Sequence, residues 1–371
     1  MAHCSAEVRE SATLLDSEVG LLRGAGFVLK AAEKGSISIA FVQEALQAAE
    51  RHNVAPEPLL REAGISAGLL DSPDARVTPE NFGGLWRAIA KELDDEFFGL
   101  DSRRMKVGSY ALMCRLGMGC EQLGEAAAHI CEFLNVILDD TLVTLSSEGA
   151  DARIVLNDRS AVSDESRRVY AHETLFVLIH GLLCWLIGRR IGIRQARLSY
   201  CRPTWAREYE IVFCPDLVFD SDETAFIFLA TSLDARIVQD ERSLQKFLSG
   251  APSNFLLKYR DETSLSARVR RRVRQARPES WPSCAQVARE LNMGASSLHR
   301  KLALEGTSFR LIRDELRRDL AIQYLTQSQF GIADIAAAVG FAERSAFHRA
   351  FKSWTGVHPG AYRELHVEAG L

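Results

Sequence analysis

The stretch "IADIAAAVGFAERSAFHRAFKSWTG", residues 332–356, contains two apolar patterns of helical spacing separated by a short break. The break at residues 340–342 begins with a glycine, which is a turn signal. In the second pattern one face is apolar and the opposite face is polar and basic. The stretch therefore predicts a helix, a turn and a second helix. The apolar face of the second helix holds Phe347, Ala350, Phe351 and Trp354.

The same pattern occurs upstream, in "SCAQVARELNMGASSLHRKLALEG", residues 283–306. It opens with a capping box, Ser283-x-x-Gln286, in which each side chain bonds a free backbone amide of the first turn. Matching Ala288 with Ala336 gives a repeat of 48 residues, with one extra residue in the later helix. A single helix-turn-helix pattern is common among helical hairpins, whereas two at a fixed offset are far more specific.

A predicted helix at residues 307–328, opened by Thr307 or Ser308, joins the two units. Its length would be about 33 Å at ~1.5 Å per residue. One turn of DNA measures about 34 Å. We call the second helix of each unit its reading helix. A linking helix of this length is suited to place the two reading helices in successive major grooves on one face of the duplex. Its apolar stripe is Phe309, Ile312, Leu316, Leu320 and Tyr324.

Upstream of residue 250 the patterns are mixed. Residues 36–140 are mostly helical in pattern, residues 139–158 indicate a hairpin, and residues 163–188 indicate a long apolar helix. Short strands are expected at 196–201, 209–214 and 216–220, followed by a helix at 232–248. The predicted fold is an α+β N-terminal domain followed by an all-α C-terminal domain with two helix-turn-helix units joined by a long helix. The predicted parts are a poorly ordered start at 1–35, an α+β effector-sensing or dimerisation domain at 36–249, a linker at 250–263 and a DNA-binding domain at 264–364, with helix-turn-helix units at 283–305 and 332–355.

Charge is distributed unevenly along the 371 residues, whose formal net charge is -4. Residues 251–371 hold 19 Lys and Arg against 12 Asp and Glu, which leaves 26 against 37 for the rest. Phosphate binding needs a local density of cations, so this pattern fits a polyanion partner for the C-terminal third, or ordinary variation along a chain. The six arginines between residues 268 and 277 fit phosphate contacts and a solvated helix face equally well.

The N-terminus has no basic segment followed by an apolar one, so no secretory signal is expected. The longest apolar stretch, residues 174–188, is shorter than the ~18–20 residues of a membrane span, and a buried core helix is predicted instead. The eight cysteines form no Cys-x-x-Cys pair, which predicts free thiols, a cytoplasmic location and no bound metal.

The C-terminal pattern resembles the AraC/XylS family of bacterial transcription regulators. The similarity covers residues 264–363 and is carried by the Leu-His-Arg-Lys-Leu core of the first unit and by the ending Ala-Phe-x-Arg-Ala-Phe-Lys-x-Trp-x-Gly-x-x-Pro-x-x-Tyr-Arg. Departures are small: Gly294 and Ala342 replace the usual serine before each reading helix, and His358 precedes Pro359 where serine or threonine is commoner.

The resemblance implies that the two reading helices present eight side chains to DNA. Arginine can bond a guanine edge at two points, so Arg300 and Arg349 are the strongest candidates for base reading. Phosphate contact is the favoured role for Lys301 and Lys352. The eight predicted contacts are Ser296, Ser297, His299, Arg300, Arg344, Ser345, His348 and Arg349.

Residues 207–237 are similar to the arabinose-binding-like N-terminal domain of ornithine-utilisation-type regulators, which implies an effector-binding role and names no ligand. The expected partners are double-stranded DNA, an unidentified small-molecule effector, RNA polymerase and a second copy of the chain, with no membrane. The expected function is a sequence-specific transcription regulator, an activator. A domain that only dimerises, with control by expression level or a protein partner, is the alternative.

Enzymatic chemistry is not expected. The related fusion to an alkylation-repair methyltransferase needs a reactive Pro-Cys-His cysteine, and no cysteine here directly follows a proline. The sequence also lacks a nucleophile elbow, a phosphate-binding glycine loop and a His-Glu-x-x-His motif, so no catalytic residue or cofactor is predicted. His180 is expected to be a core histidine, and Trp185, Tyr200 and Trp205 are expected in the core rather than in a pocket. The arginines of residues 189–194 follow a helix C-terminus, which favours cations.

Overall fold

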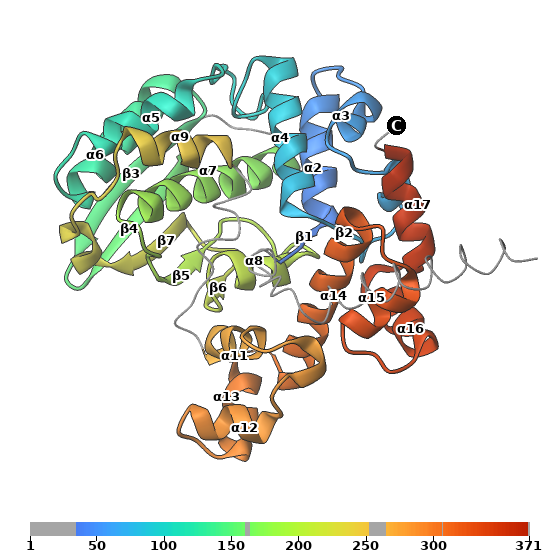
Figure 1. The fold of residues 1–371 in the computed structure, drawn as a ribbon. Helices are drawn as coiled ribbons and strands as arrows, with labels where there is room; N and C mark the ends of the chain where they lie inside the picture. The colour runs from blue at the N-terminus through green and yellow to red at the C-terminus, as the bar shows by residue number, and fades with distance from the viewer. Residues whose placement is uncertain (1–34, 160–163, 252–264, 306, 370–371) are drawn as a thin grey trace, which may run out of the picture. The chain divides into compact units, whose positions relative to one another are not determined.

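The computed structural model describes residues 35–159, 164–251, 265–305 and 307–369. Within these, residues 35–251, the N-terminal region, combine helices with a sheet, and residues 265–369, the C-terminal region, are entirely helical (Figure 1). The predicted fold class is confirmed. The predicted start at 1–35, apart from its last residue, and most of the predicted linker at 250–263 lie outside the described residues. The domain boundaries therefore stay predictions.

The N-terminal region is built on a five-stranded sheet of order β3-β4-β7-β5-β6. The predicted hairpin is confirmed as β3 and β4, which pair along their full length around a turn at Gly149. Only β5 and β6 are parallel, and the other neighbours are antiparallel. The strands are β3 (Thr141–Glu148), β4 (Asp151–Asp158), β5 (Ile193–Arg197), β6 (Leu217–Val218) and β7 (Thr224–Leu229).

One prediction for this sheet is wrong, and one of its strands was not predicted. Residues 209–214 do not form a strand but belong mainly to helix α8 (Ala206–Val212), in which Tyr209 and the following Phe213 bury their rings on one side, four residues apart. Strand β7 lies at the centre of the sheet and was not expected, because its continuous apolar run "TAFIFL" lacks the alternation of a half-buried strand. The other two predicted strands exist in shorter form, as β5 and β6.

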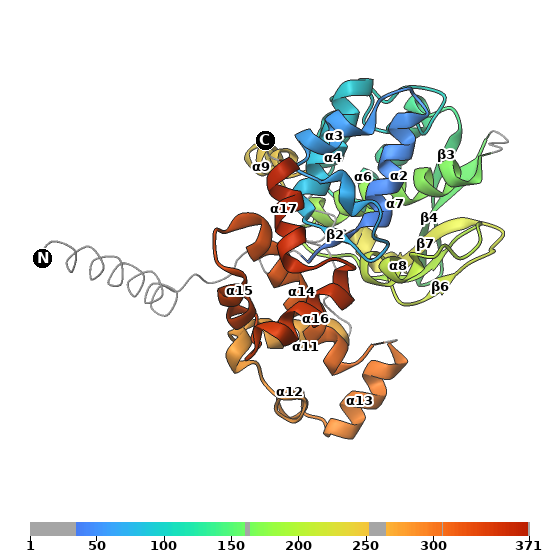
Figure 2. The same cartoon turned by 90° about the vertical axis from the view of Figure 1, so that its right-hand side faces the viewer.

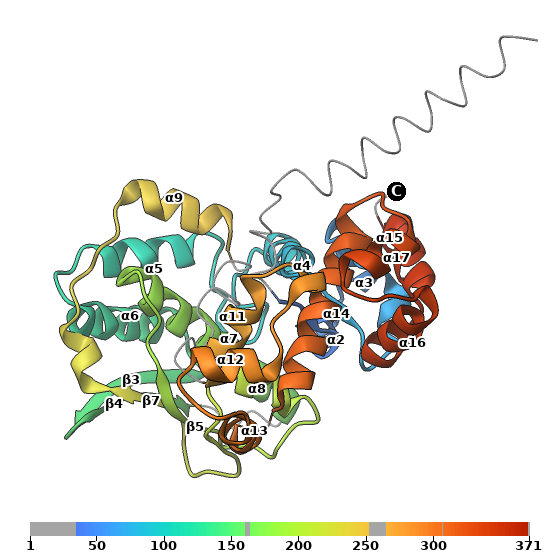
Figure 3. The ribbon, with the colours of Figure 1, turned by 60° about the horizontal axis from the view of Figure 1, so that its bottom comes forward.

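Helices α6 and α7 cover one face of the sheet (Figure 3). Phe176 of α7 packs edge-on against Phe226 of β7, with ring centroids 5.1 Å apart. Helix α7 is long and apolar enough to cross a membrane, but 94% of its most apolar window is buried inside the protein, as expected of a core helix. The helices of this region are α2 (Ile39–Glu50), α3 (Pro56–Glu62), α4 (Pro79–Leu93), α5 (Ser109–Met118), α6 (Leu123–Ile137), α7 (Glu165–Leu186), α8 and α9 (Glu241–Ser249), and β1 (Ile37–Ser38) pairs with β2 (Arg76–Val77) beside them.

The C-terminal region is organised around helix α14, which separates two groups of helices (Figure 2). Its first half packs against α11, α12 and α13 through Phe309, Ile312 and Leu316. Its second half contacts α15, α16 and α17. Ser308 caps the helix, which has 19 residues and a length of about 29 Å, shorter than the predicted 33 Å. The helices are α11 (Leu265–Arg274), α12 (Cys284–Glu290), α13 (Ala295–Leu304), α14 (Phe309–Gln327), α15 (Ile332–Ala338), α16 (Arg344–Thr355) and α17 (Pro359–Ala369).

Candidate DNA-binding surface

The first helix-turn-helix unit consists of α12 and α13. The predicted capping box is present: the Ser283 hydroxyl accepts from the Gln286 amide, and the Gln286 side chain accepts from the Ser283 amide. Leu298 and Leu302 of α13 are fully buried against α12 and α11. Their burial fixes the rotation of α13 about its axis, so the opposite side of that helix faces outward.

The second unit, α15 and α16, repeats the turn of the first. Asn292 and Gly340, 48 residues apart, both have left-handed backbone, with φ of 57° and 82°. The next amide bonds the carbonyl five residues back in each turn, at 2.9 Å from Met293 and 2.9 Å from Phe341. The sequence repeat is therefore also a repeat of backbone geometry. Asparagine and glycine are the residues that enter this conformation at least cost.

Helix α14 holds the second turn in place. The Arg317 guanidinium lies 4.9 Å from the centre of the Phe341 ring and donates to the Gly340 carbonyl at 3.3 Å. Gly340 is also close to the Pro278 carbonyl, and a Cβ there would lie 3.1 Å from that oxygen. Sequence reasoning did not single out Arg317. Its only signal was a basic residue on the predicted linking helix, which is common.

The structure places all eight predicted contacts on α13 and α16. Ser296, His299 and Arg300 are exposed, as are Arg344, Ser345 and Arg349, while Ser297 and His348 are half-buried. These positions leave the side chains available to a ligand as large as DNA, and their role as contacts stays a prediction. The predicted inward residues Phe347 and Phe351 are fully buried, and Ala350 and Trp354 are half-buried.

The two arginines favoured for base reading lack the side-chain partner that the neighbouring Arg344 has. Arg300 and Arg349 form no ion pair or hydrogen bond with any other described residue. Arg344 instead donates to His348 at 3.3 Å, and the burial of that imidazole, with Arg344 and His358 beside it, lowers the pKa of His348. A neutral His348 can accept this bond and orient Arg344. Free guanidinium groups are suited to bidentate contact with guanine or phosphate.

Part of the positive charge on α11 is neutralised within the protein. Arg270 pairs with Glu315, and Arg272 forms a bidentate ion pair with Glu290. An ion pair within the protein is a third role for these two arginines, besides the expected phosphate contact or solvated helix face. Arg300 of α13 and Arg349 of α16 have no such partner among the described residues.

A cavity in the N-terminal region lies between α2, α4, α7 and α8, with a volume of ≈ 40 Å³. Glu173 lines it and is 4% exposed. The Trp205 indole N–H donates to Glu173 Oε1 at 3.2 Å, and the Tyr209 hydroxyl donates to the same oxygen. Burial raises the pKa of Glu173 to about 8. The sequence carries only a weak signal for Glu173, a carboxylate directly before the longest apolar stretch.

The expected core histidine is confirmed. His180 is buried, its Nε2 lies 2.8 Å from the Ile191 carbonyl, and burial lowers its pKa to about 3. Trp185 is in the core, stacked on Phe247 at 4.6 Å, and Tyr200 is also buried. Trp205 is half-buried and reaches the cavity through its bond to Glu173, so it is not a simple core residue.

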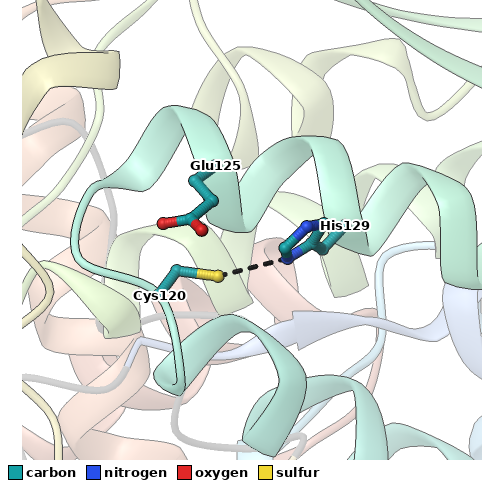
Figure 4. Close-up of side chains that lie close together, drawn as sticks. All are labelled: Cys120, Glu125 and His129. Atoms are coloured by element: carbon teal, nitrogen blue, oxygen red, sulfur yellow. Dashed lines mark hydrogen bonds between the residues drawn. The ribbon is translucent and has the colours of Figure 1, made fainter.

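Three side chains of metal-binding type meet at the start of α6, although no metal site was expected. The Cys120 sulfur lies 3.4 Å from His129 Nδ1, and the Glu125 carboxylate lies on the Cys120 side of the pair (Figure 4). Their ligand atoms all lie within 4.8 Å of one another. The seven cysteines among the described residues are free thiols.

Comparison with known proteins gives matches on both regions. The family model "Arabinose-binding domain of AraC transcription regulator, N-term" matches residues 54–237, and the model "Helix-turn-helix domain" matches residues 287–365. The ornithine utilization regulator of Pseudomonas aeruginosa is 26% identical over 329 residues, which cover 88% of this chain and 96% of that protein. The transcriptional activator NphR of a Rhodococcus species is 30% identical over 103 residues, 28% of this chain and 31% of that protein. The crystal structure of the regulator CdpR from Pseudomonas aeruginosa covers 87% of this chain and 97% of its own, at 20% identity and a TM-score of 0.32.

Proposed function

The chain belongs to the AraC family of DNA-binding transcription regulators, and from this premise we propose that it activates transcription at specific sites when a small molecule binds its N-terminal region. Helices α13 and α16 read adjacent major-groove segments, with Arg300 and Arg349 on base edges. The remaining predicted contacts bond base edges or phosphates. The protein acts in the cytoplasm as a homodimer that contacts RNA polymerase, and it acts by binding rather than by catalysis.

One observation carries the reading function. Two turns of the same backbone geometry, 48 residues apart, each precede a helix with a buried apolar face and an exposed arginine that has no partner among the described residues. Arg300 and Arg349 are 49 residues apart, at corresponding places once the one extra residue of the later helix is counted, and neither bonds another described residue. A pair of DNA contacts explains both.

The sensing function is supported by the position of the cavity. Ile37 and Tyr209 line it, and their neighbours in sequence, Ser36 and Glu208, belong to a hydrogen-bonded network with the C-terminal region. A ligand that displaces Ile37 or Tyr209 therefore changes a contact with the helix that joins the two reading units. This position favours sensing over a region that only dimerises.

Arg76 is the centre of that network. It forms a bidentate pair with Glu208 at 2.6 and 2.9 Å, and it donates to the Ser36 hydroxyl at 2.7 Å. Ser36 in turn donates to Asp319 of α14 at 2.6 Å. The Tyr362 hydroxyl of α17 donates to the Arg76 carbonyl at 2.5 Å. Burial alone would lower the pKa of Arg76, but Glu208 and the other nearby carboxylates raise it, so Arg76 stays charged.

A binding assay with the full-length protein tests the reading function. A preferred DNA site is first selected from a random library, and the affinities of wild type, Arg300→Ala and Arg349→Ala are compared on that site and on unrelated DNA. Each substitution is expected to weaken binding to the preferred site by about 10- to 100-fold, and binding to unrelated DNA much less. The exposed Arg310 of α14 provides the control, Arg310→Ala, which should not change the ratio. Equal losses on both DNAs would refute base reading by these arginines.

A further inference from the structure

The cavity between α2, α4, α7 and α8 combines one carboxylate with a wall of aromatic rings. Six of its eleven lining residues are aromatic, and no Lys, Arg or His lines it. Aromatic faces carry negative charge density and attract cations. The aromatic lining residues are Phe41, Phe82, Trp86, Tyr170, Tyr209 and Phe213.

Glu173 has an unused oxygen in this cavity. Its Oε1 atom accepts the bonds from Trp205 and Tyr209, while its Oε2 atom is buried and has no hydrogen-bond partner among the described residues. A buried polar atom without a partner is costly, and a ligand that donates to it would remove that cost. The lining also holds neutral donors on Trp86, Tyr170 and Thr174, but none of them bonds Oε2, so a bound molecule can supply the donor.

The ionisable groups around the cavity indicate which charge a bound molecule should carry. Glu44 of α2 is a second buried carboxyl group, and its field acts on both Glu173 and Tyr170. The phenols of Tyr170, Tyr200 and Tyr209 also interact with Glu173. The nearby positive charges, Arg51 and Arg168, act on Glu44 and on Tyr200 and do not line the cavity. An anionic ligand would find no cation in this lining, whereas a cationic ligand can pair with the Glu173 carboxylate that its own charge stabilises.

We propose that this cavity binds a small organic cation, an ammonium group on a short apolar chain, which donates to Glu173 Oε2 while its chain lies among the aromatic rings. The inference rests on the proposed sensing function, because it names the chemical class of the effector. Because burial raises the pKa of Glu173 to about 8, the carboxyl group is mostly protonated at neutral pH in the free protein. Binding of the ammonium therefore releases up to one proton to solvent and leaves a carboxylate paired with the ammonium.

Isothermal titration calorimetry with full-length protein at neutral pH tests this assignment. The probe is n-butylamine, and 1-butanol and butyrate are its neutral and anionic counterparts. The amine should bind at least about tenfold more tightly than the alcohol, and butyrate more weakly still. The heat should also change between phosphate and Tris buffers, because the released proton is taken up by the buffer. Equal affinities for amine and alcohol, tighter binding of butyrate, or no binding of the amine would overturn the proposal.

Two variants locate the binding. Glu173→Gln keeps an oxygen to accept from Trp205 and Tyr209 but cannot form the charged pair, so it should lose at least about tenfold in amine affinity and all proton release. Val177→Phe fills the cavity but leaves the Glu173 carboxyl group in place, and it should also abolish amine binding. Unchanged binding in both variants would overturn the assignment. DNA affinity is measured on the same preparations: an amine that binds without changing it would refute sensing and leave the ligand class standing.

A second candidate site, this one for a metal and separate from the cavity, is formed by Cys120, Glu125 and His129. Glu125 and His129 are one turn apart on α6, and Cys120 lies just before that helix. Tetrahedral zinc with bonds of about 2.3 Å to sulfur and about 2.1 Å to nitrogen would place those two atoms about 3.6 Å apart. The observed separation of Cys120 Sγ and His129 Nδ1 is 3.4 Å. The Glu121 amide donates to Glu125 Oε2 at 3.2 Å, which orients the carboxylate and leaves its other oxygen for a metal.

We also infer that Zn²⁺ binds at this cluster through three protein ligands, with water in the fourth position. Full-length protein without an affinity tag should compete for one equivalent of Zn²⁺ against a chromophoric chelator. With Co²⁺ it should show a thiolate charge-transfer band in the near ultraviolet. Cys120→Ser should remove that band, and Cys120→Ser and His129→Gln should each weaken zinc binding at least about tenfold. Cys201→Ser, at an exposed cysteine elsewhere, is the control and should change neither. Wild-type zinc affinity in both cluster variants would overturn the inference.

Discussion

Replacing Glu173 by glutamine should make the protein less sensitive to alkaline pH. The pKa of Glu173 is about 8 in the folded protein, against an ordinary value of 4.5. Below pH 4.5 both the folded and unfolded states hold the proton. Between pH 4.5 and 8 only the folded state holds it, so stability falls by about 1.4 kcal/mol per pH unit as pH rises. Above pH 8 the contribution of Glu173 is lost completely.

The full effect is of the order of 5 kcal/mol, an upper value because water admitted on ionisation reduces the cost of the buried charge. Glu173→Gln removes the titrating proton but keeps an oxygen for Trp205 and Tyr209. The variant should therefore match wild type within about 1 kcal/mol near pH 5 and be more stable by several kcal/mol near pH 9.

Urea unfolding of both proteins across this pH range measures the effect. Glu57→Gln, at an exposed position on α3, is the matched control and should track wild type at every pH. If Glu173→Gln tracks wild type as closely as the control does, Glu173 is ionised in the folded protein and the description of the cavity is wrong.

Three further substitutions test the packing of the C-terminal region and the hydrogen-bonded network around Arg76. Gly340→Ala should lower the free energy of unfolding by about 1–2 kcal/mol, because alanine resists the positive φ and its Cβ approaches Pro278, whereas Gly294→Ala, in open space at negative φ, should change it by less than about 0.5 kcal/mol. Ser308→Ala removes the cap of α14 and should cost about 1 kcal/mol in the same urea titration. Arg76→Met should cost about 3–5 kcal/mol because it leaves Glu208 without its cation, and adding Glu208→Gln should recover part of the loss; a double variant as unstable as the single one would contradict the ion-pair explanation.

The C-terminal region was predictable because its signals are local. Ser283 and Gln286 lie within one turn of each other, and the buried positions of α13 and α16 follow helical spacing in the sequence. The sequence offers Thr307 and Ser308 as the residue that caps α14, and the structure shows that Ser308 is the cap. The repeat of 48 residues then placed the second turn without knowledge of tertiary structure.

The N-terminal region was less predictable, since its elements depend on distant partners. Residues 209–214 are rich in the aromatic and β-branched residues that favour a strand, but Tyr209 and Phe213 contact each other four residues apart at the end of helix α8. Strand β7 is recognisable only once β4 and β5 are known to lie on its two sides. The pattern of a single sequence therefore predicts neither helix α8 nor strand β7.

The network and the cavity were beyond sequence reasoning for the same reason. Ser36 and Asp319 are 283 residues apart, and Arg76 and Tyr362 are 286 apart. The reading helices needed no such information, because an exposed face follows directly from the buried one. Contacts with bases depend on a DNA partner and stay predictions.

The claim that two units of one chain read two adjacent major-groove segments is tested most directly by base-contact footprinting. Methylation interference on the selected DNA site, with full-length protein, should show two groups of contacted guanines about ten base pairs apart on one face of the duplex. Arg300→Ala should remove interference in one group only, and Arg349→Ala in the other only. A single group, or two groups that both substitutions alter alike, would contradict the claim.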